Sequence, residues 1–152
     1  MSLEVSLATL AEGVAADARG SLTLVAVNPH ALIADQLPAQ FSPVLVATIE
    51  DSDIEHAVIV PGLEMTARVE ATGPDDVVLF VAQMRQVVVP PPHPTLRPRV
   101  QVIAQVPFAA SKSGLYTISA HVAFVGAGEE VKGEVTITRQ VRVTDAATLA
   151  SK

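Results

Sequence analysis

Residues 114–125, with the sequence GLYTISAHVAFV, alternate between apolar and polar side chains, and this alternation constrains the fold most strongly. One parity holds the apolar residues Tyr116, Ile118, Ala120, Val122 and Phe124. The other parity includes Thr117, Ser119 and His121. A period of two is typical of a β-strand with one packed face and one wet face. Because a strand needs partners, the rest of the chain must supply a sheet.

Further short apolar or alternating segments, separated by Gly and Pro turns, predict the other strands of that sheet. They lie at residues 3–7, 21–27, 44–49, 56–60, 63–70, 77–89, 97–106 and 131–143. We therefore predict an all-β fold, an antiparallel β-sandwich of about eight or nine strands that is immunoglobulin-like or jelly-roll-like. Arg139 falls on the apolar parity of the last strand, which predicts a bulge or a sheet edge there.

Two segments are expected to be helical or peripheral. Asn28 and Pro29 favour a helix start, so residues 29–38 are predicted to form a short helical lid that ends at Pro38. Residues 1–145 are predicted to form a single domain, and residues 146–152 a C-terminal tail that can be helical.

The composition excludes several classes of function. The chain has no cysteine, which removes disulfides, zinc–thiolate sites and thiol catalysis. Its formal net charge is −6 and it lacks a basic patch, so we expect no nucleic-acid binding. No apolar run reaches the roughly 18 residues of a membrane helix, and the acidic start Met1-Ser2-Leu3-Glu4 does not resemble a signal peptide. We expect a protein of the cytoplasm, or part of a particle assembled there, without contact with a membrane.

Three segments together resemble a family of small, uncharacterised bacterial β-sandwich domains, found often in actinobacteria. The segments are 7–11 (LATLA) followed by 19–24 (RGSLTL), the strand at 63–70, and the hairpin entry at 114–116 (GLY). The resemblance implies a β-sandwich over nearly the whole chain. It implies no activity and no functional residues, because that family has no established activity.

The acidic loop at residues 50–56 is the candidate cation site. Asp51, Asp53 and Glu55 offer carboxylate oxygens, which Ca²⁺ prefers, and His56 follows directly. The loop lacks the glycine and the distal glutamate of an EF-hand, so a solvated acidic loop is the alternative interpretation.

No catalytic residues are predicted, and no cofactor. His121 shares the polar row of its strand with Ser119, but the sequence has no Gly-x-Ser-x-Gly elbow to present a serine nucleophile. An exposed histidine without catalytic function is the expected outcome.

The surplus of apolar strand surface is the feature with the strongest functional implication. Residues 77–82 are apolar on both parities, and residues 87–89 extend the segment. We predict an interface through Val78, Phe80, Val88 and Ile103, because contiguous apolar patches usually mark association. Coverage by the lid at residues 29–38 is the alternative within one subunit.

Two classes of function follow from these features. The first is a non-enzymatic binding or assembly module, a homo-oligomer or a partner of another protein, that associates through its apolar strand surface. The second is a protein that binds a small ligand or metal, or an enzyme, with its site in loops at one end of the sandwich, at Asp51, Asp53, Glu55 and His56.

Overall fold

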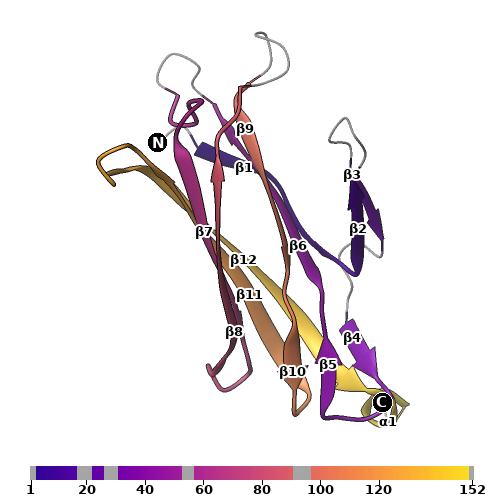
Figure 1. The fold of residues 1–152 in the computed structure, drawn as a ribbon. Helices are drawn as coiled ribbons and strands as arrows, with labels where there is room; N and C mark the ends of the chain where they lie inside the picture. The colour runs from indigo at the N-terminus through magenta and orange to yellow at the C-terminus, as the bar shows by residue number, and fades with distance from the viewer. Residues whose placement is uncertain (1–2, 17–21, 26–30, 53–56, 91–96, 151–152) are drawn as a thin grey trace.

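The computed structural model describes residues 3–16, 22–25, 31–52, 57–90 and 97–150 (Figure 1). Over these residues the strands are β1 (Leu3–Ala11), β2 (Gly13–Ala16), β3 (Leu22–Val25), β4 (Ala31–Ala34), β5 (Ala39–Phe41), β6 (Val44–Asp51), β7 (Glu64–Thr72), β8 (Val78–Val87), β9 (Arg99–Gln105), β10 (Phe108–Ala110), β11 (Gly114–Val125) and β12 (Val131–Asp145). One short helix, α1 (Ala146–Ala150), follows β12. The predicted all-β class is confirmed. The described residues contain more strands than the eight or nine predicted. The additional ones are β2, β4, β5 and β10, which are each only three or four residues long.

The larger sheet has five strands in the order β4-β12-β11-β7-β8. Its neighbours are antiparallel except β12 and β4, which are parallel. β11 lies in the middle, and its bounds coincide with the predicted strand at 114–125. Its apolar parity, from Tyr116 to Phe124, is buried, whereas His121 on the other parity is exposed. The alternation in the sequence therefore marks the inner and outer faces of this sheet.

The second main sheet has three antiparallel strands in the order β1-β6-β9. Two further sheets of the described residues, β5–β10 and β2–β3, have two strands each. Every residue of its central strand from Val44 to Ile49 is buried. Since neighbouring side chains of a strand point to opposite faces, β6 is covered on both sides. This strand, and not the segment 77–89, is the doubly buried strand of the described chain.

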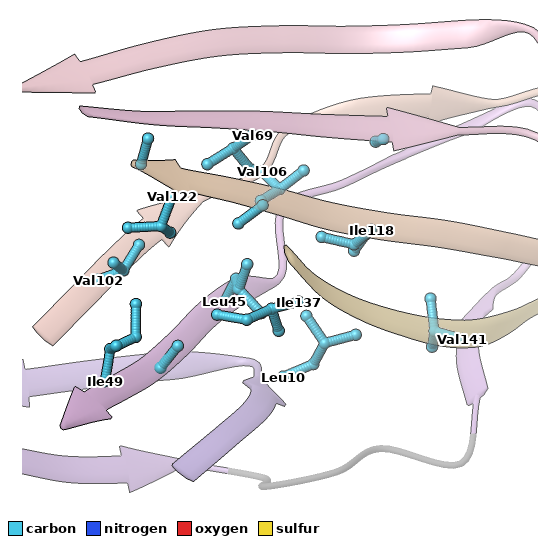
Figure 2. Close-up of a cluster of buried hydrophobic side chains, with 14 of the residues drawn as sticks. Leu10, Leu45, Ile49, Val69, Val102, Val106, Ile118, Val122, Ile137 and Val141 are labelled. Carbon is cyan, nitrogen blue, oxygen red and sulfur yellow. The ribbon is translucent and has the colours of Figure 1, made fainter. Parts of the chain in front are cut away.

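The two sheets share one hydrophobic core (Figure 2). Leu45 and Ile49 of β6 point toward Ile118 and Val122 of β11, and Ile137 of β12 fills the space between the sheets. At one end of the core, an aromatic group closes the space. The ring of Phe108 lies 6.0 Å from the ring of Phe41 and 5.4 Å from the ring of Tyr116. These pairs tie the small β5–β10 sheet to the end of β11.

A polar side chain links the edges of the two sheets on each side of the core. On one side, Arg139 of β12 donates from Nε and Nη2 to the carbonyl oxygen of Ala8 in β1, at 3.0 and 2.9 Å. On the other side, Gln86 of β8 donates to the carbonyl oxygen of Gln101 in β9, at 3.4 Å. Among the described residues, β4 pairs with β12 only from Arg142 onward, so Arg139 lies at an edge of the sheet, one of its two predicted settings.

Two predicted segments differ from the structure. The helical lid over 29–38 is wrong in its described part, because Ala31–Ala34 forms strand β4. This segment gains backbone hydrogen bonds by adding to the free end of β12, and it buries Leu32 in the core. The predicted strand at 56–60 is also wrong in its described part, since residues 57–60 form a loop. Within the described residues no helix is long and apolar enough to cross a membrane.

Candidate interaction surface

Strand β8 contains most of the apolar segment 77–89 and forms an edge of the five-stranded sheet. Among the described residues it pairs with β7 alone. The pairing skips Leu79, because Ala71 lies opposite Phe80 whereas Thr72 lies opposite Val78. Leu79 is thus the extra residue of a β-bulge, and the regular edge extends from Phe80 to Val87.

The side chains of β8 separate into an inner and an outer set. The inner set packs against the core only in part: Phe80 and Met84 are half-buried. Large apolar side chains that stay exposed on and beside the strand are Val77, Val78, Leu79, Val81, Val87 and Val89. A gathering of this kind on one strand exceeds the scattered apolar residues that are normal at a protein surface.

The four predicted interface residues have different environments. Val78 is 50% exposed at the start of β8, and Phe80 is half-buried beside it. Ile103 is half-buried on β9, the neighbouring edge of the other sheet. Val88 is 3% exposed and belongs to the core, so its inclusion in the interface is corrected. It points inward because it continues the inner parity of Phe80 and Met84. The exposed apolar residues on the outer side of this part of β8 are Val81 and Val87.

The free edge of β8 also lacks the features that usually prevent strands from pairing with other molecules. The strand is ten residues long, and its sequence VLFVAQMRQV contains no proline, no lysine and only one charged residue, Arg85. Short length, inserted charges and proline are the usual protections of an edge. The opposite edge strand, β4, has only four residues, and the edge strand β1 carries Glu4 and a register shift between Val5 and Leu7.

The predicted cation site is only partly within the described residues. Asp51 is fully buried, and its Oδ2 atom accepts a hydrogen bond of 2.6 Å from the backbone N–H of Ile59. Its carboxylate therefore holds the loop at residues 57–60 against β6. Asp53, Glu55 and His56 lie outside the described residues. Within the described part of the chain, no group of three or more His, Cys, Asp or Glu side chains could hold a metal ion.

His121 has more polar neighbours than the sequence indicates. Its Nδ1 lies 3.0 Å from Oγ1 of Thr136, and its Nε2 lies 3.1 Å from Oε2 of Glu134. Both partners come from β12, which pairs with β11 through this region. The Thr136 hydroxyl, the His121 imidazole and the Glu134 carboxylate lie in a row in space, and this arrangement resembles a catalytic triad. His121 and Glu134 are, however, both about half exposed to water. Such exposure weakens the electrostatic effects on which acyl transfer depends.

A hollow of about 300 Å³ lies beside His121 on the outer face of the larger sheet, over β7 and β8. Two arginines line it, and each is already paired with a carboxylate of its own chain. Arg68 lies 2.8 Å from Glu70, and Arg85 lies 3.3 Å from Glu64. These pairs reduce the positive charge that an anionic ligand would meet, so the hollow offers a weaker basis for function than the edge of β8.

The comparisons with known proteins support the fold. The chain matches no family model and no curated protein, so its resemblance to uncharacterised bacterial β-sandwich domains stays a prediction. Among solved structures it is similar to the C-terminal domain of Wzt, with a TM-score of 0.56 and 10% sequence identity. That match covers 94% of this chain and 74% of the other. At this identity the similarity supports the all-β fold and carries no function.

Proposed function

We propose that this protein is a non-enzymatic assembly module that associates with further copies of itself through the apolar edge strand β8. The observation that carries the proposal is the exposure of large apolar side chains along a strand whose outer edge has no described pairing partner. Removing such side chains from water is the dominant favourable contribution to most protein association.

The contrast between β6 and β8 supports this proposal. Both strands are apolar on both parities, as VLVATI and VLFVA show. In β6 the fold covers both faces, whereas in β8 Val78 is 50% and Val81 is 45% exposed. A second subunit that contacts β8 would pack its own side chains beside the apolar ones that β8 exposes. We infer that the surplus apolar surface is an interface.

The alternative function, a ligand or metal site at residues 51–56, has less support. Asp51, its first predicted ligand, is buried and accepts the Ile59 N–H. A carboxylate used in this way has less capacity left for a cation.

The proposed fold is finer than the all-β class. Two sheets that share a core support a β-sandwich of immunoglobulin-like or jelly-roll-like type. We further propose that the module works in the cytoplasm or in a particle assembled there, which imaging of the tagged protein in cells would test.

Light scattering on size-exclusion fractions tests the self-association. We expect the native chain to have at least twice the mass of one 15.9 kDa chain, and Val78→Glu to reduce it to a single chain that is still folded by circular dichroism. Leu115→Glu is the matched control, because Leu115 is 45% exposed, similar to the 50% of Val78, but lies on β11. It should leave the oligomer intact.

A native monomer at every concentration tested, or equal effects of Val78→Glu and Leu115→Glu, would overturn the proposal. Melting curves with and without Ca²⁺ test the alternative in the same samples. An increase in melting temperature with Ca²⁺ in a monomeric native protein would favour the ligand-binding function instead.

A further inference from the structure

We propose that the partner of β8 is the β8 strand of a second copy, paired edge to edge and antiparallel, so that the two five-stranded sheets become one continuous sheet. This inference rests on the proposed self-association and adds the geometry of the contact. The two copies would be related by a two-fold axis near the middle of the strand.

The backbone of β8 favours pairing by the edge over stacking by the face. Beyond the bulge at Leu79, the segment from Phe80 to Val87 is regular and carries no proline to interrupt hydrogen bonding. The outer face of the sheet is polar where β7 and β11 pass, at Arg68, Glu70 and His121. Face-to-face stacking would bury these polar groups, whereas edge pairing leaves them in water.

The one charged residue of β8 favours the antiparallel direction. Arg85 lies near the C-terminal end of the strand, and its partner in its own chain is Glu64. Antiparallel pairing about the middle of the strand places Arg85 of one copy beside Val81 of the other, whereas parallel pairing in register places Arg85 beside Arg85, where like charges repel. The antiparallel direction also brings the exposed apolar residues at opposite ends of the strand, Val78 and Val87, together across the contact.

The middle of the regular edge lies beside Gln83, whose side chain is on the outer, exposed face. The two Gln83 side chains would meet near the two-fold axis. Val87 of one copy would lie close to Val78 of the other, while the two Val87 residues would be about 26 Å apart at 3.3 Å per residue. Each end of the strand would therefore contact the opposite end of its partner.

Single cysteines with a short bismaleimide cross-linker test this geometry, because the native chain contains no cysteine. We expect Gln83→Cys to be captured as a dimer. Arg68→Cys is the matched control, since Arg68 lies directly opposite Gln83 on β7. Edge pairing separates the two β7 strands by about 14 Å, three strand spacings, so this variant should not cross-link. Val87→Cys should cross-link only when it is mixed with Val78→Cys.

The possible results separate this geometry from the proposed self-association. Equal capture of Arg68→Cys and Gln83→Cys would indicate face stacking. Capture of Val87→Cys without any Val78→Cys in the mixture, together with capture of Gln83→Cys, would indicate parallel strands. Either result overturns the geometry and leaves self-association through β8 in place. If none of these variants cross-links although light scattering finds an oligomer, both the geometry and β8 as the interface are wrong. A native monomer overturns both proposals.

Discussion

At the scale of single residues, Asp51 shows how a residue suited to binding can instead stabilise the fold. From the sequence it is one of several acids in a loop, and its residue type suggests a calcium ligand. In the structure it occupies the last position of β6 opposite Leu3, and its carboxylate faces the backbone of Ile59. The sequence could not predict this role, because it depends on the path that the chain takes after residue 56.

Removal of the Asp51 carboxylate should therefore destabilise the fold. We expect Asp51→Ala to lower the free energy of unfolding by about 2–3 kcal/mol, because it leaves the buried N–H of Ile59 without its acceptor. Asp51→Asn should cost less, since an amide oxygen can still accept the hydrogen bond. Urea unfolding measures both variants. Asp75→Ala is the control, because it removes only an exposed pair with Lys112, which should contribute at most about 1 kcal/mol. Equal losses for Asp51→Ala and Asp75→Ala would contradict this role.

Asp145 stabilises the start of α1 in a pH-dependent way. Its carboxylate accepts hydrogen bonds from the hydroxyl and the backbone N–H of Thr148, and these bonds lower its pKa below the ordinary value of 3.8. A lowered pKa contributes stability that is present above pH 3.8 and is lost as the pH falls through the folded value. We expect an NMR titration of Asp145 to have its midpoint below 3.8 and Thr148→Val to raise it, because the hydroxyl contributes most. An unchanged midpoint in Thr148→Val would show that the hydroxyl does not contribute.

At the scale of elements, the sequence predicted where the strands lie better than which strands pair with each other. The segment 114–125 coincides with β11, because strict alternation occurs only where one face is buried and the other is wet. The doubly apolar segments 44–49 and 77–82 could not be separated in this way. Their composition is similar, but pairing on both sides places β6 in the centre of its sheet, whereas β8 has one neighbour. The helix predicted at 29–38 is wrong in its described part for the same reason, since pairing of Ala31–Ala34 with the distant β12 overrides local helix signals.

The same substitution in β6 and β8 should reveal this difference. Val46 is fully buried on the outer side of β6, whereas Val81 is exposed on β8. We expect Val46→Thr to lower the free energy of unfolding by about 2 kcal/mol, because its hydroxyl is buried. Val81→Thr should change this free energy by less than about 0.5 kcal/mol in dilute protein, where the monomer dominates. Urea unfolding of both variants at low concentration is the measurement. Similar losses would mean that β8 is covered within one subunit.

At the scale of the whole molecule, two sheets enclose one core, and a long polar side chain links their edges on each side. Arg139 joins β12 to β1, and Gln86 joins β8 to β9. These links hold the two sheets together at places where no strand pairing between described residues connects them. Within the described parts of the chain, the outer backbone edge of β8 has no strand paired with it, and we propose that a second copy occupies it.

Hydrogen exchange of the native protein at two concentrations tests whether β8 pairs with a second copy, because it reads the backbone of β8 without any substitution. If copies pair through β8, exchange of its amides should slow as the protein concentration rises. The amides of β1, the edge strand on the opposite side of the core, should keep the same rates at both concentrations. Exchange rates in β8 that do not change with concentration, in a sample that light scattering shows to be oligomeric only at the higher one, would contradict the account.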